Sequence, residues 1–294
     1  MVSRAEVPGV KLGISKTLSP ARRAQNTFAM VLIGLGTAIV LLPLFLILKD
    51  LIGKGFSSLN LQFFTQSQSG ITFLGSGGGF LNAIVGSVIM LAVALVIGVI
   101  VGIGTAIFLT EYREHKLVPS VRLMGDVLTG MPAIVVGLVV YGLIVRGLNL
   151  GYSGIAGGLA LGLIMIPVIV RATEEVLKLV PQTLREAGLA LGLPRWKVIM
   201  NIVLPTARSG IITGVILAVA RVSGEAAPLI FTAFGNSFLT WNPTDKMSGL
   251  PLAVYRSAFE PSEAAVARAW SGALVLVVAI LVASLIARFA ARKR

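Results

Sequence analysis

Six apolar stretches run through this sequence, and each is close to the length of a helix that crosses a lipid bilayer. A spanning helix needs about 20 predominantly apolar residues, and its backbone groups must bond to one another because the hydrocarbon offers them no partner. The pattern therefore predicts an all-α integral membrane protein with six transmembrane helices. We expect these helices at Phe28–Leu48, Phe80–Thr110, Val121–Val145, Gly154–Val170, Ser209–Phe231 and Ala264–Ala287.

The composition excludes most other classes of protein. Of 294 residues, 56% are hydrophobic and 13% are charged, whereas a soluble domain carries about 25% charged residues. The sequence has no cysteine and one histidine, which excludes a disulfide framework and a thiol nucleophile and disfavours a metal site. The net charge is +13, and we expect these charges to face anionic lipid rather than nucleic acid.

Lysine and arginine are distributed unevenly between the two sides of the predicted membrane domain. Eighteen of the 25 lie in the N-terminal segment, the loops after the second and fourth spans and the C-terminal tail, six lie on the opposite side, and Arg221 lies within a span. The positive-inside rule then places both termini in the cytoplasm. The predicted organisation is a basic cytoplasmic segment at 1–26, a first transmembrane helix at 27–48, an extracytoplasmic loop at 49–79, a transmembrane domain at 80–288 and a basic cytoplasmic tail at 289–294.

Three prolines, Pro43, Pro132 and Pro167, fall inside the predicted spans. Spanning helices tolerate proline where neighbouring groups bond the carbonyls that it frees. We therefore expect each helix to continue through its proline.

Two local arrangements are expected within the bundle. The small residues Gly98, Gly102 and Gly104 would let another helix approach closely. Asp126 would form an ion pair with Arg122, one turn earlier on the same helix, and a role in the substrate pathway is its alternative.

The polar segment between the fourth and fifth spans, 172–208, contains a spaced motif. The residues that define the motif are Glu186, Ala187, Gly188, Gly192, Ile202, Leu204 and Pro205. The motif resembles the cytoplasmic loop of ATP-binding-cassette importer permeases, which reads Glu-Ala-Ala, three residues, Gly, nine residues, Ile, one residue, Leu-Pro. Gly188 in place of the second Ala is the only departure. The resemblance implies the type I importer permease fold and a short helix that sits in a groove of a cytoplasmic ATPase.

Local signals in this docking loop predict two short helices. Thr183 and Glu186 have the spacing of a capping box, so a helix should begin at Leu184. Gly192 can adopt the left-handed conformation that ends it, and Pro194 can open the next helix. The expected unit is helix, tight turn, helix, lying along the membrane. A lipid-surface hairpin without a partner is the alternative.

One arginine lies deep in the fifth predicted span. Arg221 is about twelve residues from its start, roughly 18 Å along a helix axis, and a charge there costs about 2.5–3.5 kcal/mol on insertion scales. Glu225 would lie one turn further on the same face. Arginine matches a tetrahedral oxyanion, and a carboxylate accepts a hydrogen bond from P–OH while it repels sulfate. The pair therefore favours phosphate; an intrahelical pair that neutralises itself is the alternative.

Two further stretches resemble phosphate importer permeases. The run 220–229 matches the Ala-Arg-x-x-Gly-Glu-x-Ala-Pro-Leu pattern of their fifth helix, and the run 167–175 leads into the docking loop as it does in that family. The resemblance covers about 78–293 and is closest to the A-type permease, which pairs with a C-type permease.

The resemblance also implies site residues. In that family, basic residues matching Arg171 and Arg221, and the acid matching Glu225, are implicated in phosphate passage. Arg171 lies at the end of the predicted fourth span, so snorkelling to the interface is its alternative role.

The resemblance implies a transmembrane permease subunit of an ATP-driven phosphate importer in a prokaryotic cytoplasmic membrane. The chain has no Gly-x4-Gly-Lys-Ser/Thr loop, so separate subunits must use the ATP-Mg, and we expect no cofactor, metal or catalytic residue here. The implied partners are a homologous C-type permease chain, two ATP-binding subunits, phosphate, the lipid bilayer and an extracytoplasmic phosphate-binding protein that contacts the outer segment 235–261.

Three other functions are weighed against this one. The same architecture could carry sulfate, molybdate or an organic solute, but a neutral solute does not need Arg221 and Glu225. A channel or secondary carrier would not need a docking loop. A polytopic membrane enzyme would need clustered catalytic side chains, and one histidine with few acids offers little to build them from.

Overall fold

The computed structural model describes residues 19–70 and 78–292, and over these ranges the chain forms helices and no named β-strand. Most of the predicted N-terminal segment, part of the predicted loop 49–79 and the last two tail residues lie outside the described residues. The chain divides into two compact units, 1–50 and 51–294. The predicted side of the membrane for each terminus, and the predicted domain boundaries, stay predictions.

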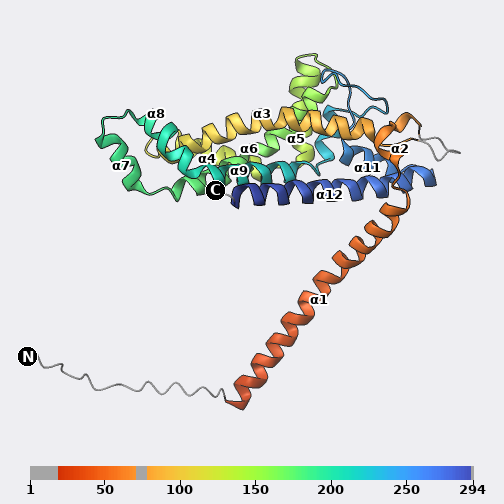
Figure 1. The fold of residues 1–294 in the computed structure, drawn as a ribbon, viewed down its shortest axis with the longest axis horizontal. Helices are drawn as coiled ribbons and strands as arrows, with labels where there is room; N and C mark the ends of the chain where they lie inside the picture. The colour runs from red at the N-terminus through yellow and green to blue at the C-terminus, as the bar shows by residue number, and fades with distance from the viewer. Residues whose placement is uncertain (1–18, 71–77, 293–294) are drawn as a thin grey trace, which may run out of the picture. The chain divides into compact units, whose positions relative to one another are not determined.

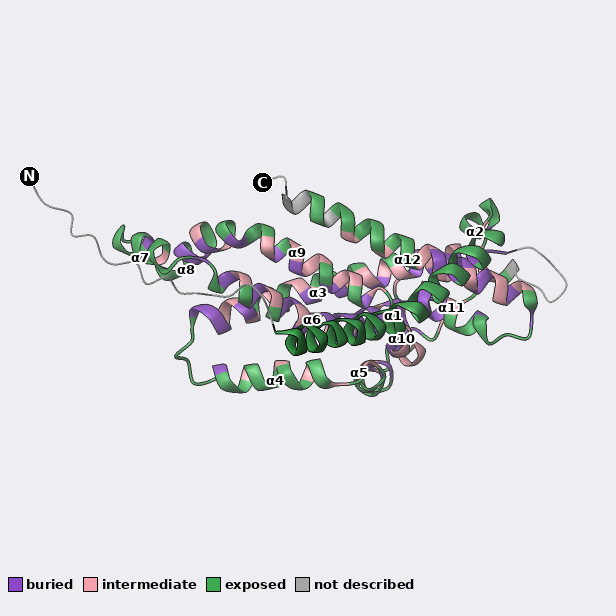
Figure 2. Cartoon of the chain, turned by 90° about the horizontal axis from the view of Figure 1, so that it is seen from below, coloured by how far each residue is buried: buried purple, intermediate pink, exposed green. Residues whose placement is uncertain are grey.

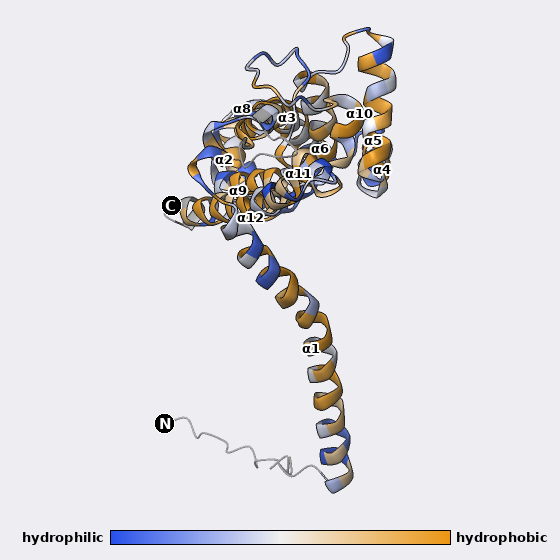
Figure 3. Ribbon diagram, turned by 90° about the vertical axis from the view of Figure 1, so that its right-hand side faces the viewer, coloured by the Kyte–Doolittle hydropathy of each residue, from blue (hydrophilic) through white to orange (hydrophobic). Residues whose placement is uncertain are grey.

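The first unit is the N-terminal part of α1 (Pro20–Ser57) (Figure 1). Ser19 precedes the helix, its hydroxyl accepts a 3.4 Å hydrogen bond from the backbone N–H of Arg22, and Pro20 takes the first helical position. α1 continues through Pro43, as predicted. Figure 3 shows hydrophobic residues along most of its length, which suits a helix surrounded by lipid or by a partner.

The centre of the second unit is a close pair of long helices, α3 (Leu81–Glu111) and α6 (Gly154–Lys178), which lie side by side in Figures 1 and 2. A Cβ added at Gly98 would lie 2.9 Å from Met165 Sδ, and one at Gly102 would lie 2.8 Å from Ile169 Cγ2. The predicted close approach is therefore confirmed at Gly98 and Gly102. A Cβ at Gly104 would meet no atom of the described chain within 4 Å, so the close approach of a helix there stays a prediction.

The third predicted span is broken. α4 (Val118–Gly130) and α5 (Ala133–Val140), which is continued by the π-helix η2 (Tyr141–Gly147), meet at an angle of 109°. Pro132 has no N–H to continue the ladder, and it pushes the preceding residue, Met131, into an extended conformation with ψ 131°. In Figure 2, α4 runs lengthwise and α5 is seen nearly end-on. The expectation of an uninterrupted helix through Pro132 is wrong, whereas α6 does continue through Pro167.

The remaining helices surround this centre. Their bounds are α2 (Leu61–Thr65), η1 (Gln68–Gly70), α7 (Gln182–Ala190), α8 (Arg195–Val198), η3 (Ile199–Val203), α9 (Leu204–Val222), α10 (Ala227–Thr232), α11 (Leu250–Ala258) and α12 (Glu263–Arg292). Among the described residues, five helices are long and apolar enough to cross a bilayer, and counting the bent pair α4–α5 as one span makes six. With five or six spans, the described part of the chain is an all-helical membrane domain.

The α3–α6 contact can be tested with one methyl group. Gly102→Ala should lower the free energy of unfolding by about 1–3 kcal/mol, because an overpacked interface must shift, and the added Cβ would lie 2.9 Å from the Cβ of Ile169, close to its backbone. The measurement is thermal unfolding of the protein in detergent. Gly104→Ala is the matched control, since its methyl meets no atom within 4 Å. Equal melting temperatures for the two variants would contradict the close approach.

Candidate functional site

Arg221 and Glu225 do not share a helix face. α9 ends at Val222, Glu225 lies in the link to α10, and its N–H donates to the carbonyl of Val222 at 3.1 Å. Pro228 lies in the first turn of α10 and cannot continue the helical hydrogen bonds of α9. The predicted continuous fifth span, and with it the i,i+4 pairing, is therefore wrong.

The two side chains nevertheless border the same cavity. Its volume is about 90 Å³, and its lining consists of Leu128, Thr129, Met131, Ala133, Ile164, Pro167, Val168, Arg221 and Glu225. Among the described residues, no ion pair within 4.0 Å joins the arginine to the glutamate. The guanidinium and the carboxylate thus both stay available to a third group.

The cavity lies where two interrupted helices meet. Met131 and Ala133 belong to the break between α4 and α5, and Glu225 belongs to the break between α9 and α10. α5 and α10 touch so closely that a Cβ on Gly137 would lie 2.7 Å from the Cα of Pro228. Val135 and Val136 donate their N–H groups to the carbonyl of Pro132, whereas no such bond is made by the N–H groups of Ala133 and Ile134 among the described residues. This end of α5 therefore adds positive potential to the cavity that Arg221 lines.

Arg171 lies one helical turn beyond Pro167 on α6, outside the cavity lining. The sequence placed Arg171 at the end of the fourth span. In the structure α6 extends to Lys178, so Arg171 lies within the helix. Its guanidinium forms an ion pair with Asp126 of α4, and both side chains are about half exposed. The expected pairing of Asp126 with Arg122 is wrong.

Arg122 instead forms an ion pair with Glu174 of α6 at 2.7 Å. Lys178 reaches the same carboxylate oxygen at 3.1 Å, and the Glu174 side chain is only 2% exposed. Together with the Asp126 pair, this pair fixes α4 to α6. Sequence reasoning missed it because the two residues lie 52 positions apart, although an acid inside an apolar helix is itself a signal.

The docking loop keeps part of its predicted form. α7 begins at Gln182 with Pro181 as its N-cap, and no side chain caps it, so the predicted capping box is wrong. Gly192 does adopt the left-handed conformation, with φ 79°. The N–H of Gly192 donates to Leu189 O at 2.9 Å, and that of Leu193 to Gly188 O at 3.3 Å, which closes the turn.

The motif residues divide between two surfaces. Glu186 and Ala187 are exposed on α7, whereas Gly188 is buried, and a Cβ there would lie 2.8 Å from Ile202 Cδ1. Leu204 and Pro205 open α9. α8, η3 and α9 form one 28-residue helical run, so the second half of the motif lies at the base of a span rather than in a separate hairpin.

The turn after α7 gives a second prediction. Gly192→Ala should destabilise the turn by about 1–2 kcal/mol, because a Cβ is unfavourable in the left-handed region. Hydrogen exchange of the Leu193 N–H, which bonds across this turn, reports the change as faster exchange. Gly192→Asn is the control and should exchange more slowly than the alanine variant, since asparagine tolerates this conformation. The same exchange rate in the alanine variant and the unmodified chain would exclude the strained turn.

Comparisons with known proteins agree on one family. Residues 98–294 match the family model described as binding-protein-dependent transport system inner membrane component. The phosphate transport system permease protein PstA of Pasteurella multocida is 40% identical over 94% of this chain and 97% of its own length. PstA of Xylella fastidiosa (strain Temecula1) is 42% identical over 93% of this chain and 95% of its own length.

A solved structure shares the fold. An inward-facing structure of the MetNI methionine ABC transporter matches with a TM-score of 0.58 and 18% identity, over 71% of this chain and 92% of the matched chain. At this identity the likeness concerns the fold alone.

Proposed function

This chain belongs to the family of binding-protein-dependent transport system inner membrane components, and we propose that it forms half of the path through which an ATP-driven importer moves inorganic phosphate. Relatives that share about 40% of its residues over nearly its whole length are phosphate transport permeases. The protein is a multi-pass subunit of a bacterial cytoplasmic membrane, and its function is transport rather than catalysis.

The observation that carries the substrate assignment is the placement of Arg221 and Glu225 around one cavity without a direct ion pair. The guanidinium offers a planar fork of donors to two phosphate oxygens. The ionised carboxylate is an acceptor only, so it takes the hydrogen bond of a P–OH group and repels a fully deprotonated anion. Hydrogen phosphate satisfies both groups, whereas sulfate has no proton to give.

Arg171 is proposed as a second phosphate contact. It lies about one helical turn from the cavity wall at Pro167 and carries Asp126 as its partner. A half-exposed ion pair of this kind is weak, so an arriving phosphate can replace the carboxylate of Asp126 on the guanidinium. Phosphate would then pass from Arg221 to Arg171, where it takes the place of the Asp126 carboxylate.

The proposed assembly contains a second, homologous C-type permease, two ATP-binding subunits and an extracytoplasmic phosphate-binding protein. The exposed Glu186 and Ala187 of α7 are the proposed contact with an ATP-binding subunit, which would bind and hydrolyse ATP-Mg. The outer segment 235–261 is the proposed contact with the binding protein, and both termini are cytoplasmic. Movement of α7 would shift the spans between inward-facing and outward-facing states.

Arg221→Ala tests the proposed path. Removing charge-assisted hydrogen bonds worth about 1.5–3 kcal/mol should slow phosphate uptake by about 10-fold to 100-fold. The measurement is radiolabelled phosphate uptake in cells whose own phosphate importers are deleted and which express this chain with its partner subunits. The amount of chain in the membrane is measured in parallel.

Arg288→Ala is the control for that experiment, because it removes an exposed arginine from α12. Sulfate uptake through the cell's own importer checks that ATP supply is unchanged. Full phosphate uptake by the Arg221 variant would leave the family assignment standing and remove Arg221 from the path.

Glu225→Gln tests the role of the carboxylate. Glutamine keeps the size of the side chain but loses the negative charge that strengthens the hydrogen bond accepted from P–OH, so the uptake rate should fall by about 10-fold, the equivalent of one charge-assisted hydrogen bond. Uptake is measured with saturated binding protein, and Glu114→Gln, which neutralises an exposed loop carboxylate, is the control. An unaltered rate in the Glu225 variant would rule out this carboxylate as the hydrogen-bond acceptor.

A further inference from the structure

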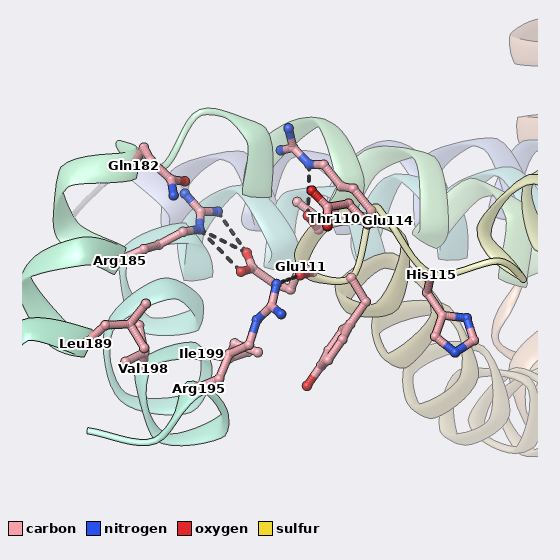
Figure 4. A pocket seen from close by; sticks show the side chains of 12 residues that line it. Thr110, Glu111, Glu114, His115, Gln182, Arg185, Leu189, Arg195, Val198 and Ile199 are labelled. Carbon is pink, nitrogen blue, oxygen red and sulfur yellow. Dashed lines mark hydrogen bonds and ion pairs between the residues drawn. The ribbon is translucent and has the colours of Figure 1, made fainter. Parts of the chain in front are cut away.

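The end of α3 meets two helices from much later in the chain, α7 and α8, at one buried residue, Glu111. Glu111 is the last residue of α3 and is 7% exposed, and it lines a cleft of about 680 Å³ together with residues of α7 and α8. Figure 4 shows Arg185 of α7 and Arg195 of α8 converging on Glu111. None of these three residues belongs to the phosphate cavity.

Arg185 uses all three of its guanidinium nitrogens. Nε donates to Glu111 Oε1 at 3.1 Å, and Nη2 donates to the same oxygen at 2.8 Å. Nη2 also donates to the carbonyl of Leu177 at 3.0 Å, and Nη1 donates to that of Val180 at 2.6 Å. One side chain of α7 thus bonds the end of α3 and the end of α6.

Arg195 ties α8 to the same point. Its Nη2 donates to the backbone carbonyl of Glu111, and its guanidinium carbon lies 4.6 Å from the centroid of the Tyr112 ring. Among the described residues, every hydrogen bond that links α7 to α3 or α6 comes from Arg185. α7 otherwise packs against α8 and η3.

A buried ion pair is weak evidence for a purely stabilising role, because apolar residues of the same volume would often stabilise the fold as well. What this pair adds is a directed link: a guanidinium fork holds its partners in one relative orientation. α6 then extends the link, since Leu177 and the cavity residue Pro167 are ten positions apart on one helix, about 15 Å along its axis. α3 follows α6 because the two pack closely at Gly98 and Gly102.

We propose that Glu111 and Arg185 are positioning residues for transport, which transmit movement of α7 to α3 and α6 and through α6 to the cavity at Arg221. This proposal rests on the proposed function, in which α7 contacts an ATP-binding subunit. The pair does not touch phosphate. Its loss should therefore separate ATP hydrolysis from phosphate movement rather than abolish both.

The experiment uses the complete importer, reconstituted in proteoliposomes with its own partner subunits and inorganic phosphate. Phosphate uptake and ATP hydrolysis are measured on the same preparation for the unmodified chain, Glu111→Gln and Glu114→Gln. Glu114 lines the same cleft but is exposed and forms no ion pair among the described residues, so it is the matched control. The expected result for Glu111→Gln is hydrolysis within about twofold of the unmodified importer and at least a tenfold loss of phosphate moved per ATP.

Arg185→Lys is the second variant. It tests the proposal if the importer with Glu111→Gln does not assemble. Lysine keeps the charge but lacks the fork that bonds Glu111 and two carbonyls together, so the same loss of phosphate per ATP is expected. A ratio equal to that of Glu114→Gln, or a parallel loss of uptake and hydrolysis in an assembled complex, would overturn the proposal. If the unmodified importer moves no phosphate, the proposed function fails instead.

Discussion

The bilayer leaves no water for backbone groups, and this constraint governs the fold. Almost every long segment is a helix whose groups bond internally, and an irregular backbone is tolerated only where it borders a cavity or packed protein. Two helix breaks, at Met131–Pro132 and at 223–226, both border the cavity that holds Arg221 and Glu225. The breaks that would be costly in lipid thus lie beside a cavity lined by an arginine and a glutamate.

The bend between α4 and α5 lies at one of these breaks. α4 ends at Gly130 because Pro132 interrupts the helix, although the apolar residues continue into α5. The bend brings the free N–H groups at the start of α5 beside a guanidinium.

Much of this could be predicted from sequence, and the limit has a physical reason. Hydropathy locates the spans. The docking loop is recognised because its motif residues lie close together in the sequence and are spaced by turns of helix. The ion pairs of Arg171 with Asp126 and Arg185 with Glu111 join residues 45 and 74 positions apart, and no helical period reports a contact between different helices. Pro132 and Pro167 look alike in sequence, yet only the first breaks its helix, because tertiary packing decides whether the freed groups find partners.

The continuous helical run from Arg195 to Val222 joins the turn after α7 to Arg221. An insertion or deletion of one residue within it would turn Arg221 by about 100° around the helix axis relative to α8 and aim the guanidinium at a different neighbour. The π-helical turn of η3 already holds the wider spacing that an added residue produces. Evolution of this segment is therefore expected to proceed by substitution at fixed length.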